Sequence, residues 1–466
     1  MSHLVILNLG KGDYDLGCPA VTAQLWLQDD LAPMQVMGSL PAAPELGALY
    51  YRWQQLYGAL YAHRGWRQAE LTQYRPDVDL VRSTRSQSDS EFEIEQDETY
   101  ITDVSEAAFK QNCQELYHHL NTWLNVDTFR SIDRHLRTRL MPSDQVRLII
   151  TAENHALLRL PWHLWHFLED YPRAELALSL PEYTRSIKTS STTPKPTVNI
   201  LAILGNRQGI NITRDQELLE QLPDTALKLL VEPNLEDLHQ QLWHPGWDVL
   251  FFAGHSSSQG TGRIYVNATE SLTIAQLRLA LKKAIEHGLK LAIFNSCDGL
   301  ELAWSLADLQ IPQVIVMREP VPDRIAQEFL KHFLTAFSSG QSLYLSVREA
   351  RERLQALETQ FPCATWLPVI CQNPAELPPR WQDWCSQIPQ RPEILPPPHL
   401  PTSPSPHSPI PPSPCPSPAL YRRVLLGSLL TTGLVLGIRW FGLLQPLELW
   451  AFDRLLTLRP QETPDL

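Results

Sequence analysis

A histidine and a cysteine each follow a short apolar stretch near the middle of the chain. Residues 249–253 (VLFFA) lead to His255, and residues 289–294 (LKLAIF) lead to Cys297. Short runs rich in β-branched and aromatic residues predict strands of a buried parallel sheet. A cysteine attacks as its thiolate, and a nearby imidazole can accept the thiol proton. The two residues therefore have the chemistry of a nucleophile and its base, provided that the strands are neighbours.

A helix is predicted between the two strands. Residues 272–287 place apolar side chains at helical spacing, and Gly288 follows as a helix stop. A strand–helix–strand unit makes a right-handed crossover, so both strands end at the same edge of the sheet. Ligands of open α/β sheets bind at this carboxyl edge. We therefore expect His255 and Cys297 to meet there.

Groups that would assist the cysteine lie beside it in the sequence. Residues 299–308 predict a helix with Asp298 at its N-cap, and a helix N-terminus lowers the pKa of a nearby thiol. The backbone N–H groups of Gly254, Ser256 and Asp298 are candidates for an oxyanion hole. The alternative is structural, because an isolated cysteine or histidine after a strand is often only a packing residue.

The residues around the pair resemble the two active-site motifs of CHAT-domain proteins, which are bacterial caspase-like peptidases of the caspase–separase clan. The motifs are AGHS at 253–256 and FNSCDG at 294–299. The similarity continues through 317–354 and reaches back to LPWHLW at 160–165. A CHAT domain is thus expected over residues 145–375.

The resemblance implies a caspase-like α/β/α sandwich with a mainly parallel sheet. It also implies a cysteine endopeptidase that acts on protein or peptide substrates with no cofactor and no metal. His255 would be the general base and Cys297 the nucleophile. Ser256 stands where caspases have a glycine whose N–H serves the oxyanion hole, and serine keeps that N–H. The alternative is a catalytically silent CHAT-type module that binds peptides in signalling.

Charged residues near the cysteine bear on which peptide bond would be cleaved. Asp298, Glu319 and Asp323 are candidate acids of a substrate pocket, against one candidate base, Arg318. Because pockets complement the charge of the group they bind, the excess of acids favours a basic residue before the scissile bond.

Strands and helices alternate through the expected domain, as in doubly wound sheets with helices on both faces. The predicted strands cover 146–152, 197–204, 227–231, 247–253, 289–294, 312–316 and 366–372. The predicted helices cover 213–221, 235–242, 272–287, 299–308, 321–337 and 342–357. Pro368 places the last strand at a sheet edge. GNRQG at 205–209 either lines the cleft or is an ordinary turn.

Residues 1–140 are expected to form an N-terminal, mostly helical α+β domain. A strand over 4–9 precedes a helix over 44–62 with an aromatic stripe, and 104–140 predicts two further helices. The position of this region before a protease-like domain motivates the hypothesis that it binds a regulatory partner.

The composition excludes some classes of function. The formal net charge of −12 argues against a nucleic-acid partner, because phosphate binding needs clustered Lys and Arg. The seven cysteines have no regular spacing and include no CxxC pair, so neither a disulfide framework nor a structural zinc site is expected. Reduced thiols indicate the cytosol.

The C-terminal part changes composition twice. Residues 386–420 are a proline-rich linker, which predicts an extended polyproline spacer. Residues 424–444 form an apolar run of about 20 residues, enough to span a bilayer once, and Arg422 and Arg423 place the preceding domains in the cytoplasm. The alternative is a hydrophobic helix docked on the rest of the protein. Residues 445–466 resemble the start of a CHASE2 sensor domain, a combination that resembles cyanobacterial proteins.

Two further interpretations belong to other classes of function. A flavodoxin-like domain that binds a small molecule would need a glycine-rich phosphate turn after its first strand, and 205–209 matches it poorly. His163 and His166 have a spacing that could share one helix face, but the tryptophans beside them favour a packed aromatic patch over a metal site.

Overall fold

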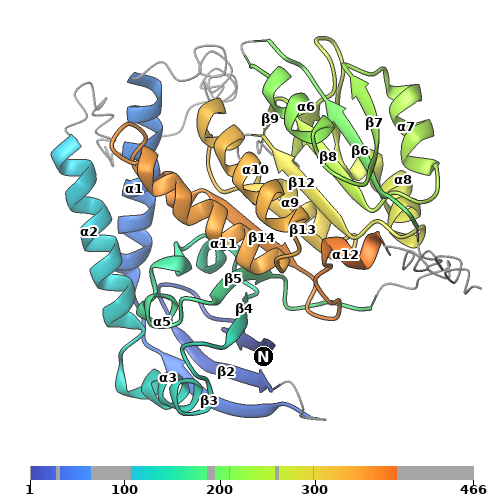
Figure 1. Ribbon diagram of the computed structural model, residues 1–466. Helices are drawn as coiled ribbons and strands as arrows, with labels where there is room; N and C mark the ends of the chain where they lie inside the picture. The colour runs from blue at the N-terminus through green and yellow to red at the C-terminus, as the bar shows by residue number, and fades with distance from the viewer. Residues whose placement is uncertain are drawn as a thin grey trace, which may run out of the picture. The chain divides into compact units, whose positions relative to one another are not determined.

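The computed structural model describes residues 2–27, 32–63, 106–185, 195–208, 210–257, 262–296 and 299–385 (Figure 1). Cys297, Asp298 and the three C-terminal segments predicted within 386–466 lie outside these ranges. In the described part of the chain, no helix is both long and apolar enough to cross a membrane.

Within the described residues, eleven strands form one sheet in the order β3-β2-β1-β4-β5-β14-β13-β12-β8-β6-β7. The strands are β1 (Ser2–Asn8), β2 (Cys18–Trp26), β3 (Met34–Leu40), β4 (Gln145–Thr151), β5 (Ala174–Ser179), β6 (Val198–Leu204), β7 (Thr225–Val231), β8 (Val249–Ala253), β12 (Leu291–Asn295), β13 (Gln313–Met317) and β14 (Pro368–Gln372). Neighbours are parallel except for β1 with β2, β2 with β3 and β13 with β14. The expected mixed α/β fold with a large, mostly parallel sheet is thus confirmed.

The antiparallel contact between β13 and β14 divides this sheet into two halves. The motif half consists of β6, β7, β8, β12 and β13, and the support half consists of β1–β5 and β14. The parallel strands β1, β4, β5 and β14 run opposite to those of the motif half. The carboxyl ends of the two sets therefore lie at opposite edges of the sheet.

The N-terminal strands belong to the same sheet as the expected CHAT domain. β1 pairs in parallel with β4, from Ser2 beside Gln145 to Asn8 beside Thr151. The predicted boundary near residue 140 therefore falls inside one continuous sheet. The sequence pattern indicated β1 and β4 but missed β2, β3 and β5.

The predicted position of the strand that contains Pro368 is wrong. β14 lies in the interior of the sheet, between β13 and β5. Pro368 is its first residue and lies opposite Met317, the last residue of β13. A proline at the first position of a strand interrupts little of the hydrogen-bond ladder, so it does not require an edge.

Helices cover both faces of the sheet. They are α1 (Pro44–His63), α2 (Glu106–Trp123), α3 (Asp127–Arg139), α4 (His155–Leu158), α5 (His166–Asp170), α6 (Thr213–Glu220), α7 (Leu235–Trp243), α8 (Ile274–Glu286), α9 (Leu300–Ala307), α10 (Asp323–Ser338), α11 (Leu343–Arg353) and α12 (Trp381–Trp384). Three short 3₁₀ turns are η2 (Trp162–Leu164), η3 (Leu354–Leu357) and η4 (Ala364–Trp366). Right-handed crossovers put α7, α8 and α9 on one face of the motif half and α6 on the other, where α10 contacts it.

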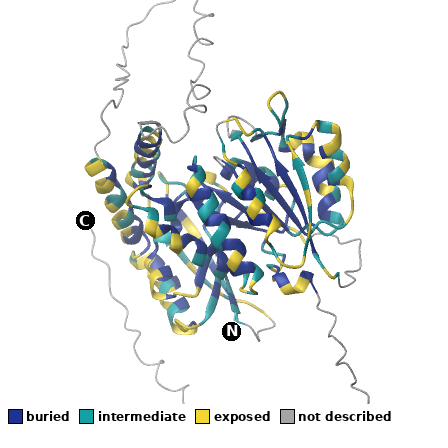
Figure 2. Ribbon diagram, turned by 45° about the horizontal axis from the view of Figure 1, so that its top comes forward, coloured by how far each residue is buried: buried dark blue, intermediate teal, exposed yellow. Residues whose placement is uncertain are grey.

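The burial pattern explains why these segments adopt their structures. All five residues of β8 and all five of β12 are buried, as expected for central parallel strands covered on both faces (Figure 2). α10 buries one apolar stripe that includes Phe329, Phe333 and Phe337. α8 starts at a capping box in which Thr273 and Gln276 satisfy each other's backbone N–H groups.

Candidate active site

The two motif strands are direct neighbours. β8 and β12 pair in parallel, and Ala253 lies opposite Asn295. His255 and Cys297 each follow these paired residues by two positions in the sequence. The expected adjacency of the two strands is therefore present, while Cys297 itself is outside the described residues.

A hydrogen bond joins the two motifs beyond the ends of the strands. The Ser256 hydroxyl donates to the Ser296 hydroxyl at 3.0 Å. Ser256 follows the histidine and Ser296 precedes the cysteine. Ser296 is fully buried, so this bond fixes the separation of the two segments at a site shielded from water.

Two glycines let the ends of β6 and β8 approach each other. A Cβ atom on Gly254 would lie 3.1 Å from the Gly205 Cα atom, and Gly254 has a φ of 156° that disfavours a side chain. A Cβ atom on Gly205 would lie 2.4 Å from the carbonyl oxygen of Tyr265. The Gly205 N–H donates to the carbonyl of Ala253 at 2.8 Å. Small residues thus bring the loop after β6 against the residues that precede His255.

That loop holds the imidazole. The Nε2 atom of His255 lies 2.7 Å from the carbonyl oxygen of Gln208. A carbonyl can only accept a hydrogen bond, so Nε2 carries the proton and Nδ1 of the neutral ring is left as the basic atom. The described part of the segment 205–209 therefore lies beside the imidazole, and Gly209 is outside the described residues.

The backbone after His255 continues into a small sheet. β9 (Ser256–Ser257), β10 (Arg263–Tyr265) and β11 (Ser271–Thr273) pair in the order β11-β10-β9. The Tyr265 N–H donates to the His255 carbonyl at 3.0 Å, and Ser256 lies opposite Ile264. Because antiparallel pairs alternate, the Ser256–Ile264 pair is of the non-hydrogen-bonded type. The Ser256 N–H therefore points away from β10, as an oxyanion donor would require.

On the cysteine side, sequence reasoning missed one residue. Asp215 of α6 is buried, and its Oδ1 accepts a hydrogen bond from Asn295 Nδ2 at 2.7 Å. Asn295 ends β12, two residues before Cys297. Asp215 lies far from both motifs in the sequence. The one available signal was that this acidic residue shares the buried face of α6 with Leu218 and Leu219.

The helix after the cysteine begins one residue later than predicted. α9 starts at Leu300 with Gly299 at its N-cap position and no side-chain cap, whereas the sequence had placed Asp298 there. The Gly299 N–H donates to the Met317 carbonyl at 2.8 Å, and a Cβ atom would lie 2.6 Å from Val316. Close packing against β13, which only glycine permits, fixes the start of this helix.

The charged residues proposed for a substrate pocket lie in different environments. Glu319 is buried and accepts hydrogen bonds from Tyr50 (3.3 Å) and Gln54 (2.6 Å) of α1, and burial raises its pKa. Asp323 accepts from the Asn211 N–H at 3.0 Å, in the segment that follows the Gln208 loop. Asp323 is thus near the histidine loop, whereas Glu319 faces α1.

Arg318, the candidate base, is also engaged inside the protein. It is 1% exposed, and its guanidinium donates to the backbone carbonyls of Arg159, Leu160 and Trp366. The arginine therefore ties the end of β13 to the LPWHLW segment rather than facing solvent.

The two histidines of that segment have separate partners. His163 packs edge-on against Trp366 with ring centroids 5.6 Å apart, while His166 Nε2 lies 2.9 Å from the Tyr117 hydroxyl. Among the described residues, no three His, Cys, Asp or Glu side chains are grouped as a metal site would need.

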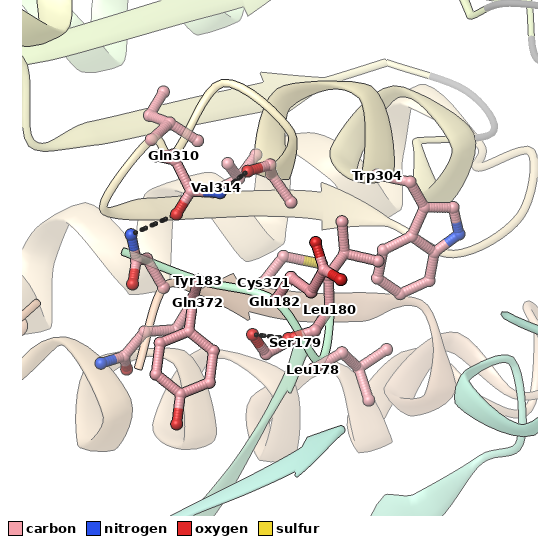
Figure 3. A pocket seen from close by; sticks show the side chains of 13 residues that line it. Leu178, Ser179, Leu180, Glu182, Tyr183, Trp304, Gln310, Val314, Cys371 and Gln372 are labelled. Atoms are coloured by element: carbon pink, nitrogen blue, oxygen red, sulfur yellow. Dashed lines mark hydrogen bonds between the residues drawn. The ribbon is translucent and has the colours of Figure 1, made fainter. Parts of the chain in front are cut away.

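A small cavity lies elsewhere, between the end of β5, β14 and α9 (Figure 3). Its volume of about 10 Å³ accommodates roughly one water molecule. The Ser179 hydroxyl at its wall donates to the Leu180 carbonyl. None of the predicted site residues lines this cavity.

The comparison with protein-family models agrees with the motifs. The CHAT domain family matches residues 113–384, which is more than half of the chain. Among solved structures, the Saccharomyces cerevisiae separase–securin complex is similar at 12% sequence identity, with a TM-score of 0.45. That similarity covers 80% of this chain and 30% of the other, and no curated protein sequence matches significantly. On the family match, the chain belongs to the CHAT-domain family.

Proposed function

We propose that the chain is a cysteine endopeptidase that cleaves protein substrates, with Cys297 as nucleophile and His255 as general base. The observation that supports this most strongly is the parallel register of Ala253 with Asn295, reinforced by the Ser256–Ser296 hydrogen bond. When two adjacent parallel strands end at paired residues, the residues that follow them lie close together at the carboxyl edge of the sheet.

In this proposal, Nδ1 of His255 accepts the thiol proton and the Cys297 thiolate attacks the scissile carbonyl carbon. The imidazolium then donates its proton to the leaving amine, and water hydrolyses the thioester with the histidine again acting as base. The Gln208 carbonyl supports the imidazolium, because it accepts a hydrogen bond from Nε2–H in both protonation states of the ring. The chemistry needs no cofactor.

The N–H of Ser256 is the proposed main oxyanion donor, with the N–H groups of Gly254 and Asp298 as further candidates. Donors aimed at the developing charge contribute about 3–4 kcal/mol each to such reactions. The orientation of the Ser256 N–H away from β10 supports its assignment.

For specificity, we propose a basic residue before the scissile bond, with Asp323 and Asp298 as the acids that recognise it. Glu319 is left out of this pocket because it is buried against α1. Asp323→Asn should lower cleavage after Arg and Lys relative to cleavage after neutral residues in a peptide library. Preferred cleavage after Asp would overturn the assignment.

The test of the activity uses the full chain and an electrophilic peptide probe at neutral pH, with the modified residue mapped by mass spectrometry. Labelling at Cys297 is expected, with complete loss in Cys297→Ala and a fall of about 10²–10⁴ in rate in His255→Ala. Cys371→Ala, a buried cysteine on β14, is the matched control and should label normally. Labelling spread over several cysteines and insensitive to His255 would favour a catalytically silent peptide-binding module.

The sequence also supports a membrane tether through residues 424–444, with 386–420 as a stiff spacer and the CHAT domain on the cytoplasmic side. The proposal predicts that the full chain stays with membranes after alkaline carbonate extraction, whereas deletion of 424–466 releases it. Release of both forms would contradict the tether. A regulatory partner for residues 1–140 is likewise proposed from position alone.

A further inference from the structure

Two cysteines far apart in the sequence meet away from the candidate active site. The Sγ atoms of Cys113 and Cys363 lie 3.4 Å apart. Cys113 is on α2, and Cys363 precedes η4, the turn that leads into β14. Among the described cysteines, the other three are buried, and no contact joins any of them to another thiol.

The surroundings hold both thiols in place. On the α2 side, Asn112 is buried next to Cys113 and donates to the Leu49 carbonyl of α1 at 3.2 Å. On the other side, Trp366 stacks on Trp53 of α1 with ring centroids 5.4 Å apart. The Trp366 N–H donates to the Cys363 carbonyl at 2.9 Å. The contact between the sulfur atoms is therefore built into packed segments on both sides.

The exposure of Cys113 and the distance between the two sulfur atoms permit a disulfide bond to form. A disulfide needs the sulfurs to approach from 3.4 Å to about 2.05 Å, a movement that side-chain rotation can supply. Cys113 is half-buried and Cys363 is 7% exposed. A dissolved oxidant would thus reach Cys113 first, and Cys363 would act as the resolving thiol beneath it.

We propose that Cys113 and Cys363 form a reversible redox modification site that, when oxidised by a low-molecular-weight disulfide, locks α2 onto the turn before β14. The Cys113 thiolate attacks one sulfur of glutathione disulfide, forms a mixed disulfide and releases one glutathione thiolate, which takes up the proton. The Cys363 thiolate then attacks the Cys113 sulfur and expels the second glutathione. Two protein thiols are oxidised, and one glutathione disulfide is reduced to two glutathione molecules.

The lock has a physical consequence for the fold. It closes a loop of 250 residues, from α2, which packs against α1, to the turn that leads into β14 at the junction of the two halves. A cross-link over so long a loop restricts the unfolded chain strongly, so the oxidised protein should unfold at a higher temperature. The proposal does not depend on whether Cys297 is a nucleophile.

The experiment compares the full chain in its reduced form and after incubation with glutathione disulfide. Free thiols are blocked with N-ethylmaleimide, and digested samples are analysed by mass spectrometry. Thermal unfolding is measured on the same two forms. A peptide pair joined through Cys113 and Cys363 is expected, with an unfolding midpoint raised by about 5 °C and reversed by dithiothreitol. Cys113→Ser and Cys363→Ser should each abolish the cross-link and the shift, whereas the matched control Cys385→Ser should keep both.

Cys363 is buried, so Cys363→Ser could fail to fold. Cys113 is more exposed, so Cys113→Ser should fold and tests the cross-link by itself. A mixed disulfide that persists on Cys113, a cross-link to a different cysteine, or a cross-link that leaves the midpoint unchanged would each overturn the proposal.

Discussion

The two halves of the sheet have similar apolar strands but differ in the residues that end or follow those strands. In the motif half, small residues follow the strands: Gly205 after β6, Gly254 after β8 and Ser296 after β12. They allow the loops to approach closely and leave a partly exposed imidazole at the edge. The backbone carbonyl of Gln208 holds the Nε2 atom of this histidine, and the hydroxyl of the next residue, Ser256, bonds to Ser296.

In the support half, the polar side chains that end β14 and β5 bond to other groups of the protein. Gln372, at the end of β14, bonds to the Tyr344 hydroxyl and to the Glu376 carbonyl, and Ser179 at the end of β5 bonds to Leu180. A buried ion pair joins Glu175 of β5 to α11. Under the proposed function, the motif half would contribute reactivity and the support half stability.

The largest expected effect is on stability, from Arg351→Met. The Arg351 Nη2 atom donates to Glu175 Oε2 at 2.8 Å, and both side chains are buried. Removal of the cation leaves a buried carboxylate without its partner, which should lower the free energy of unfolding by about 3–5 kcal/mol. Urea unfolding measures this, and Arg353→Met, which breaks an exposed pair with Glu349, should cost about 0.5 kcal/mol or less.

In the same variant, the rate of probe labelling at Cys297 per folded molecule should stay as in the wild type. The double variant Glu175→Gln/Arg351→Met should recover part of the stability, because no unpaired charge remains buried. A large fall in labelling rate would show that the two halves are coupled and would contradict their separation.

The next effect arises in the motif half, from Gly205→Ala. The new Cβ atom would lie 2.4 Å from the Tyr265 carbonyl, a backbone atom that cannot rotate away. Tyr265 supports the His255 carbonyl, so its displacement should move the imidazole. We expect a loss of about 1–3 kcal/mol in stability together with a labelling rate at least about tenfold lower.

Gly58→Ala is the matched control for that change. Gly58 is exposed within α1, and no atom lies within 4 Å of the position of a new Cβ atom. Because alanine favours helix over glycine, this variant should be more stable by about 0.5–1 kcal/mol and label normally. Equal labelling by both glycine variants would mean that the close approach at Gly205 does not position the histidine.

The motif half could be predicted from sequence because its strands and helices alternate with clear periods. The predicted strands 197–204, 247–253 and 289–294 correspond to β6, β8 and β12, with ends shifted by at most two residues. Their adjacency followed from the handedness of crossover connections. The motifs at 253–256 and 294–299 then identified the family.

The support half was less predictable, because its pairing is remote in the sequence. β5 (AELALS) is buried at every position, so it lacks the alternation of apolar and polar residues that would have indicated a strand. β14 joins β5 and β13, strands from opposite halves, and no local feature of residues 368–372 encodes that place. Asp215 was missed for the same reason, since its partner Asn295 is distant in the chain.

A smaller, pH-dependent effect is expected at the junction of the halves, from His163→Phe. Burial, with Arg351 and Arg318 nearby, lowers the pKa of His163 well below that of an exposed histidine. Below the unfolded-state pKa of about 6.5, the unfolded chain binds a proton that the native state excludes, so acid destabilises the wild type. Phenylalanine keeps the contact with Trp366 and has no proton to bind.

The difference in unfolding free energy between His163→Phe and the wild type should therefore grow in favour of the variant as the pH falls, to about 2 kcal/mol at pH 5 relative to pH 7.5. Denaturant unfolding at a series of pH values measures it. A difference that stays constant across this range would show that His163 binds a proton as readily in the folded protein as in the unfolded chain.

Asp215→Asn should cause the smallest change in stability, together with a change in the rate at which the probe labels Cys297. Asp215 holds Asn295 at the end of β12, and the exchange keeps the shape while removing the charge that strengthens the bond. We expect a loss of about 1 kcal/mol in stability and about a tenfold lower maximal labelling rate at Cys297, with the affinity for the probe unchanged. Glu220→Gln, at the exposed end of α6, is the matched control and should change neither.

A double-mutant cycle separates positioning from general loosening of the fold. If Asp215 acts through Asn295, then Asn295→Ala should lower the labelling rate by a similar factor, and the double variant should be no slower than the slower single variant. Additive losses would mean that Asp215 reaches Cys297 by another route. A change confined to probe affinity would instead assign Asp215 to substrate binding, and the motif half would then contain a charged recognition group as well as the proposed catalytic pair.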